Sequence, residues 1–149
     1  MIADSARYLG SVLSHVVDNW GGSVAIQRAS DGGAGFYVLN DKVPMFIKYT
    51  TKRHSPWSFT FSRSHQLQQQ AYYDQFGECL IVFVCGRDGI VALPHNDFRN
   101  VLDQNFETQE SVTIRRRHAT MYQISGRDGN LRHKVGRNSL TEILRTIKN

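Results

Sequence analysis

A lysine inside an apolar run is the residue of this sequence best placed to do chemistry. Residues 43–51, VPMFIKYTT, are predicted to form a β-strand, and the alternation of a strand places Lys48 on the same face as Phe46. An ammonium group beside apolar side chains is costly unless it reaches water or an anion. Lys48 is therefore interpreted as a catalytic or phosphate-contacting group, or as a long side chain whose end reaches the surface at a sheet margin.

Basic and aromatic residues alternate just beyond this strand. Lys52 and Arg53 precede Trp57 and Phe59, a composition that suits phosphate contacts combined with base stacking. The alternative is a solvated loop that leads into a strand whose Trp57 belongs to the core. We expect Lys52 and Arg53 to contact the backbone of a nucleic acid.

The densest basic cluster is formed by Arg115, Arg116 and Arg117. If residues 112–114 and 119–124 pair as strands, these arginines occupy a hairpin turn and point into water. Adjacent arginines repel one another, so an anion would stabilise them. Arg132 and Lys134 would extend the cluster into a stripe that binds DNA or RNA, and a basic turn without any ligand is the alternative.

The net charge of +5 is unevenly distributed along the chain. Residues 111–149 contain nine Lys or Arg against two Asp or Glu, whereas residues 1–110 contain nine against eleven. A positive charge concentrated in one region favours a partner rich in phosphate.

Several classes of protein are not expected from the composition. No apolar run approaches the roughly 18 residues of a membrane-spanning helix, and the first twenty residues lack the pattern of a signal peptide. Cys79 and Cys85 lie on one predicted strand, too far apart for a disulfide. The histidines show no zinc-ligand spacing. We therefore expect a cytoplasmic protein with two reduced thiols and no cofactor.

The hydrophobic pattern predicts a mixed α/β domain. The predicted elements are a helix at 2–20, strands at 23–29, 35–39, 43–51 and 57–61, a helix at 64–76, strands at 79–85 and 90–93, a helix at 95–102, strands at 112–114, 119–124 and 131–135, and a closing helix that contains residues 140–147. Two Gly-Arg-Asp-Gly tetrapeptides, at 86–89 and 126–129, are interpreted as hairpin turns that recur by chance.

The α-β-β-β-α-β order of residues 2–93, with Lys48 in the strand after a tight hairpin, resembles the PD-(D/E)XK nuclease-like superfamily. The resemblance implies a restriction-endonuclease-like core with a mixed sheet. In that family two acids hold a divalent metal, and the lysine of an acid-x-Lys triplet orients water or stabilises charge. Some members add a Gln-x-x-x-Tyr pair on the following helix, which corresponds to Gln69 and Tyr73 or to Gln68 and Tyr72.

The match to the family motif is partial. Phe46 stands where the triplet has its acid, and Asp41 lies in the preceding turn. The chain is therefore interpreted as a degenerate member, with Lys48 and Asp41 as the candidate catalytic residues and Mg²⁺ as its metal if it is active.

One domain is expected over 1–149, with a nuclease-like core at 1–93 and a basic C-terminal extension of a β-hairpin and a helix, 94–149, packed on it. We expect a nucleic-acid-associated protein that has lost metal-dependent cleavage. The alternatives are an active nuclease and a protein-interaction subunit or inhibitor in a mobile-element or defence system. The active nuclease would use magnesium held by Asp41, Asp31 or Asp74, or would work without metal through His118, Arg116 and Tyr122. A homodimer or a protein partner remains compatible with the sequence.

Overall fold

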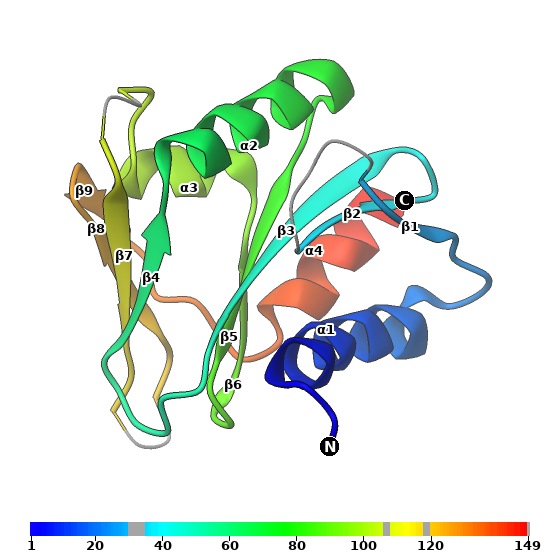
Figure 1. Cartoon of the computed structure of the whole chain (residues 1–149), viewed down its shortest axis with the longest axis horizontal. Helices are drawn as coiled ribbons and strands as arrows, with labels where there is room; N and C mark the ends of the chain where they lie inside the picture. The colour runs from blue at the N-terminus through cyan, green and yellow to red at the C-terminus, as the bar shows by residue number, and fades with distance from the viewer. Residues whose placement is uncertain (30–34, 106–107, 118–119, 149) are drawn as a thin grey trace.

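The computed structural model describes residues 1–29, 35–105, 108–117 and 120–148. Four helices and nine strands run along these residues (Figure 1). They are α1 (Asp4–Trp20), β1 (Ile26–Arg28), β2 (Phe36–Leu39), β3 (Val43–Thr50), β4 (Trp57–Phe61), α2 (Arg63–Phe76), β5 (Leu80–Cys85), β6 (Gly89–Leu93), α3 (His95–Val101), β7 (Glu110–Arg115), β8 (Gln123–Gly126), β9 (Gly129–Asn130) and α4 (Ser139–Lys148).

The strands form two sheets, and the expected mixed α/β fold is confirmed. The first sheet has the order β1-β2-β3-β5-β6, and the second has the order β4-β7-β8-β9. Strands β3 and β5 run parallel, while every other pair in the described sheets is antiparallel. The predicted α-β-β-β-α-β order runs through α1, β1, β2, β3, α2 and β5, with β4 inserted before α2 as part of the second sheet.

Strand β5 lies at the centre of the fold because every one of its six residues is apolar and buried. Alternation sends Leu80, Val82 and Val84 to one face of the first sheet and Ile81, Phe83 and Cys85 to the other. A strand that is apolar on both faces needs a layer on each side. The first group packs in a cluster with α1 and α4, and the second packs in a cluster with β4, β7 and β8.

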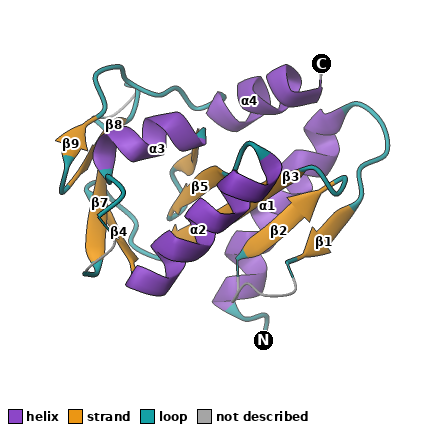
Figure 2. Cartoon of the chain, turned by 90° about the horizontal axis from the view of Figure 1, so that it is seen from above, coloured by secondary structure: helices purple, strands orange, loops and turns teal. Residues whose placement is uncertain are grey.

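The two covering layers are visible on opposite sides of the first sheet. Figure 1 shows β4, β7, β8 and β9 on the left and α1 with α4 on the right, with β3, β5 and β6 between them. Seen from above, α2 and α3 lie over the space between the two sheets (Figure 2). Helix α1 buries Leu9, Val12, Val16 and Trp20, and α4 adds Leu140 and Leu144 to the same cluster.

The chain changes sheets between β3 and β4. Strand β4 buries Trp57, Phe59 and Phe61 and exposes Ser58 and Thr60, the alternation of a half-buried strand. Its partner is β7, with Trp57 opposite Ile114 and Phe61 opposite Glu110. The C-terminal region therefore shares a sheet with a strand from the first half of the chain. The sequence pattern does not reveal this pairing, because it joins segments about fifty residues apart.

Two predicted strands differ from the structure: β8 begins at Gln123, and residues 131–135 form no strand beyond an isolated bridge between Val135 and Tyr122. Other expectations are confirmed. Cys79 and Cys85 are both buried free thiols, as expected, and burial raises the pKa of each thiol. The hairpin that joins β2 to β3 is also confirmed, and Asn40 and Asp41 in its turn have φ of 51° and 54°. Within the described residues, no helix is long and apolar enough to cross a membrane.

Candidate nucleic-acid interface

Three connections meet at the end of the molecule where β3, β5 and β7 finish. They are the β3–β4 loop, the β5–β6 turn at 86–89, and the segment between β7 and β8 (Figure 1). The parallel register of β3 and β5 places Thr50 beside Cys85. The backbone N–H of Arg116 donates to Ser55 Oγ over 3.0 Å, which joins the β7–β8 segment to the β3–β4 loop.

A pocket of about 620 Å³ opens at this end, and its lining is strongly basic. The lining residues are Ser55, Arg115, Arg116, Arg117, Thr120, Met121, Gln123 and Lys134. A second hollow of about 280 Å³ shares Arg115 and Lys134 with the first and adds Arg132 and His133. Five of the seven residues predicted to bind nucleic acid therefore line one continuous basic surface, here called the basic pocket.

Arg116 does not point into water as the sequence suggested. Its side chain is only 8% exposed and forms a salt bridge of 2.9 Å with Asp88. The Nε–H donates to the Thr120 carbonyl over 2.8 Å, and the guanidinium lies 5.4 Å from the centre of the Tyr122 ring. Arg116 is thus a structural residue of the inner wall, and the expectation of three equivalent exposed arginines is wrong.

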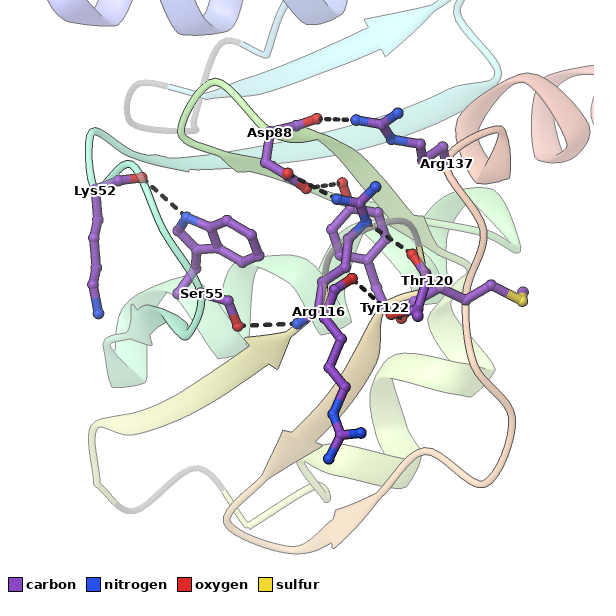
Figure 3. Close-up of polar contacts among 10 residues, drawn as sticks. Lys52, Ser55, Asp88, Arg116, Thr120, Tyr122 and Arg137 are labelled. Carbon is purple, nitrogen blue, oxygen red and sulfur yellow. Dashed lines mark hydrogen bonds and ion pairs between the residues drawn. The ribbon is translucent and has the colours of Figure 1, made fainter.

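Asp88 holds this wall together from the β5–β6 turn (Figure 3). One carboxylate oxygen accepts from Arg116 and the other accepts from the Tyr122 hydroxyl over 2.6 Å. The Asp88 carbonyl also accepts from Arg137 over 3.0 Å. Burial and the hydrogen bond to Asp88 raise the pKa of Tyr122, so the phenol remains a proton donor to the carboxylate.

The Gly-Arg-Asp-Gly segment at 86–89 does more than make a turn. Gly86 has φ of +54°, and a Cβ there would collide with the Lys52 carbonyl of the β3–β4 loop. A Cβ on Gly89 would collide with the Tyr122 hydroxyl. The segment at 126–129 is similarly close to α3, because the backbone N–H of Asp128 donates to the Val101 carbonyl over 3.0 Å. Both tetrapeptides form the predicted hairpin turns. Their contacts with neighbouring segments were not visible in the sequence.

The other cations of the basic pocket remain available. Arg115, Arg117 and Lys134 are exposed, and none of the three forms a salt bridge with a carboxylate in the described part of the chain. Arg132 is exposed as well. Guanidinium and ammonium groups with no internal partner are suited to charge-assisted hydrogen bonds with phosphate.

Lys52 and Arg53 lie on the neighbouring β3–β4 loop and are exposed. The Lys52 ammonium donates to the Pro56 carbonyl over 2.8 Å, and the Lys52 carbonyl accepts from the Trp57 indole over 3.0 Å. Trp57 is 2% exposed and belongs to the core, so it cannot stack on a base. The interpretation of Trp57 as a core residue is the one that holds.

Lys48 lies half-buried on the face of β3 that points toward the second sheet. Its ammonium is 5.6 Å from the centre of the Phe46 ring and 5.2 Å from that of Phe61. Burial lowers the pKa of Lys48. Burial also lowers the pKa of His65, with a further contribution from the Lys48 charge.

The surroundings of Lys48 do not fit a magnesium ion, which prefers carboxylate oxygens. Within the described ranges, Lys48 forms no salt bridge with a carboxylate, and no three His, Cys, Asp or Glu side chains are grouped so as to hold a metal. Asp41 is exposed in the β2–β3 turn, seven residues from Lys48, which corresponds to about 20 Å along an extended strand. The structure does not bring the two candidate catalytic residues together.

Gln69 and Tyr73 belong to a different site, centred on His95. Gln69 lies 2.8 Å from His95 Nδ1, and the Tyr73 ring stacks on the imidazole at 3.5 Å. The Arg99 guanidinium donates to the Gln69 carbonyl oxygen over 2.7 Å, so the Gln69 amide nitrogen faces His95. This network fixes α2 to α3. Of the two Gln-x-x-x-Tyr pairs, it is Tyr72 that packs on Phe36 of the first sheet.

The structure describes some of the other residues considered for a nuclease site. Asp74 is exposed on α2 and accepts from Gln70 over 2.9 Å. His118 and Asp31 lie outside the described residues. The metal-free set is thus described only for Arg116 and Tyr122, which both bind Asp88. Asp88 itself was missed as a functional candidate, because its partners lie 28 and 34 residues away.

The Asp88–Arg116 pair gives a test of which arginine is structural. Asp88→Asn leaves a nearly buried guanidinium without its counter-ion, so we expect the free energy of unfolding in urea to fall by about 3 kcal/mol. The double variant Asp88→Asn/Arg116→Gln should recover part of that loss. The matched control Arg117→Gln should change stability by less than about 0.5 kcal/mol. Additive effects of the two substitutions would show that the pair is not coupled.

The His95 network predicts a pH-dependent stability. Burial and the neighbouring Arg99 lower the pKa of His95 from 6.5 to about 4, so the folded protein keeps the imidazole neutral. The unfolded chain takes up this proton below pH 6.5, and the folded chain does not. The contribution of neutral His95 to the free energy of unfolding is therefore fully present above pH 6.5. It falls by up to about 3 kcal/mol as the pH drops to 4.

The measurement is chemical unfolding across this pH range. Asn at position 95 keeps an acceptor near the place of Nδ1 and removes the titration, so His95→Asn should flatten the profile relative to the wild type. His54→Asn, a change at an exposed residue, serves as the control and should leave the profile unaltered. Parallel profiles for the wild type and His95→Asn would show that His95 is not the source of the pH dependence.

Comparison with known proteins finds partial likenesses among solved structures alone. No family model and no curated protein matches the sequence. Among the solved structures that resemble the chain is the Holliday junction resolvase Hjc of the archaeal hyperthermophile Archaeoglobus fulgidus, at 1.6 Å resolution. The alignment covers 64% of this chain and 75% of the resolvase, with 14% sequence identity and a TM-score of 0.45. A likeness this distant transfers neither residues nor activity.

Proposed function

We propose that this protein binds nucleic acid through the basic pocket, on a nuclease-like scaffold that has lost metal-dependent cleavage. The observation that carries the proposal is the convergence of Arg115, Arg117 and Lys134 on one pocket from separate segments. Folding like charges together costs free energy in the absence of an anion. A polyphosphate bound in the pocket would offset that cost.

The different environments of the three adjacent arginines support this proposal. Arg116 is neutralised by Asp88 and fixes the wall, whereas Arg115 and Arg117 on either side of it are exposed. Alternate residues of a nearly extended segment point in opposite directions. One inward arginine therefore anchors two outward ones, which limits the entropy that they lose when they bind phosphate.

The proposed kinship with PD-(D/E)XK nucleases rests on the element order and on Lys48. The helix, the three strands, the second helix and the parallel β3–β5 pair follow the expected order, and Lys48 lies on the predicted strand. Phe46 occupies the acid position and contributes a ring that stacks on Phe36 at 3.8 Å. An aromatic core residue in place of a metal ligand supports the loss of cleavage.

The binding proposal is tested by the salt dependence of affinity for labelled DNA and RNA. Phosphate contacts by Arg115, Arg117 and Lys134 predict that log affinity falls with log salt with a slope of about −3. Arg117→Gln and Lys134→Gln should each make the slope shallower by about 1. Arg145→Gln removes the same charge from an exposed position of α4 and should leave the slope unchanged. Absence of binding to nucleic acid at low salt would contradict the proposal and favour the alternative of an acidic protein partner.

The cleavage proposal is tested with supercoiled plasmid in magnesium and in EDTA. We expect the plasmid to stay intact in both buffers, because no carboxylate pairs with Lys48 in the described residues. Cleavage that co-elutes with the folded protein, requires magnesium and disappears in Lys48→Ala would overturn this expectation. Loss of that cleavage in Asp41→Ala as well would show that the turn supplies the missing acid.

A further inference from the structure

A third hollow lies on the other side of the β5–β6 turn from the basic pocket. It has a volume of about 400 Å³ and lies between the start of α1 and the hairpin of β5 and β6. Its lining residues are Arg7, Tyr8, Ser11, Val84, Gly86, Arg87, Gly89 and Ile90. Gly86, Arg87 and Gly89 belong to the tetrapeptide at 86–89, and the proposed function assigns no nucleic-acid contact to any of the lining residues.

The chemistry of this hollow, here called the α1 groove, differs from that of the basic pocket. Val84 and Ile90 give it an apolar surface, and the Tyr8 ring forms part of its wall. Tyr8 stacks on Tyr49 of β3 at 5.3 Å with an interplanar angle of 8°, and Tyr49 is 37% exposed. A half-buried ring that is backed by a second ring is held rigidly, as a stacking platform requires.

Two arginines flank the apolar surface of the α1 groove. In the described part of the chain, Arg7 forms an exposed contact of 3.7 Å with Asp4, and Arg87 is exposed without a carboxylate partner. An apolar slot with an aromatic wall and guanidinium groups at its rim is complementary to a flat ring that carries phosphates. Among nucleic-acid components, an unpaired nucleotide has that chemistry and a paired base does not, because its faces are covered.

The α1 groove and the basic pocket are separated by one hairpin turn. Arg87 lines the groove, and its neighbour Asp88 binds Arg116 on the side of the basic pocket. Both hollows border the same turn, and a single strand that passes over this turn would reach both sites.

We propose that the α1 groove holds an unpaired base of the strand whose phosphates lie in the basic pocket, so that the protein prefers nucleic acid with a single-stranded segment. This inference rests on the proposed nucleic-acid binding. It assigns stacking to Tyr8, backed by Tyr49, and phosphate contact to Arg87.

The test compares four labelled probes by fluorescence anisotropy. They are a blunt DNA duplex, the same duplex with a poly-dT tail, the duplex with a tail of abasic sites, and poly-dT alone. The abasic tail has the phosphates of the dT tail but no bases. We expect the dT-tailed duplex to bind about tenfold more tightly than the blunt and abasic-tailed duplexes.

The variants separate stacking from charge. Tyr8→Leu keeps apolar volume against Tyr49, so it should fold normally, lose the preference for the dT tail and leave the salt slope unchanged. Tyr8→Phe should retain the preference. Arg87→Gln should make the slope shallower by about 1 for tailed probes only. Ser14→Ala, a change at an exposed position of α1 outside the groove lining, serves as the control.

The outcomes distinguish this inference from the proposed function. Equal affinities for dT and abasic tails, or a Tyr8→Leu variant that keeps the preference, would overturn the base site while salt-dependent binding to the blunt duplex still supported the basic pocket. Absence of binding to all four probes at low salt would overturn the proposed function itself.

Discussion

The burial of β5 on both faces is the constraint on which the rest of this structure depends. Six consecutive apolar residues with no polar face cannot lie at a surface, so the first sheet must be covered twice. One cover comes from α1 and α4, which are the first and last helices of the chain, and the other comes from β4 with the β7–β8 hairpin. Both halves of the sequence are therefore required to complete the two clusters. The C-terminal region is a component of the core as well as a carrier of charge.

The same arrangement positions the candidate site. Because β3 and β5 run parallel and β7 ends near them, three connections from distant parts of the chain meet at one end of the molecule. Asp88 then organises that end through Arg116, Tyr122 and Arg137 (Figure 3). A nearly buried ion pair is weak support for stability as such, but here it determines which arginine turns inward. The basic pocket and the α1 groove lie on the two sides of the turn that carries Asp88.

The sequence predicted where Lys48 lies on its strand, and only the structure showed what surrounds it. The pattern correctly placed Lys48 on a strand and on the same face as Phe46, because alternation is a local property. The phenylalanine at the acid position was also visible in the sequence. What surrounds the ammonium was not, since Phe61 and His65 reach it from β4 and α2. The predicted Gln69–Tyr73 pair has the right helical spacing, yet the rotation of α2 directs it to His95. Spacing fixes which residues share a helix face, and packing decides which neighbour that face meets.

The sequence by itself determined the mixed α/β class, the positions of most strands and helices, the buried thiols and the concentration of positive charge in the last forty residues. These follow from hydrophobic periodicity, turn residues and composition, which act over a few neighbours. Only the tertiary structure decided that β4 pairs with β7, that Arg116 is anchored while Arg115 and Arg117 stay exposed, and that Asp41 is remote from Lys48. Each of these depends on contacts between segments far apart in the chain. A carboxylate at position 88 reaches an arginine 28 residues away only because two sheets close around one buried strand.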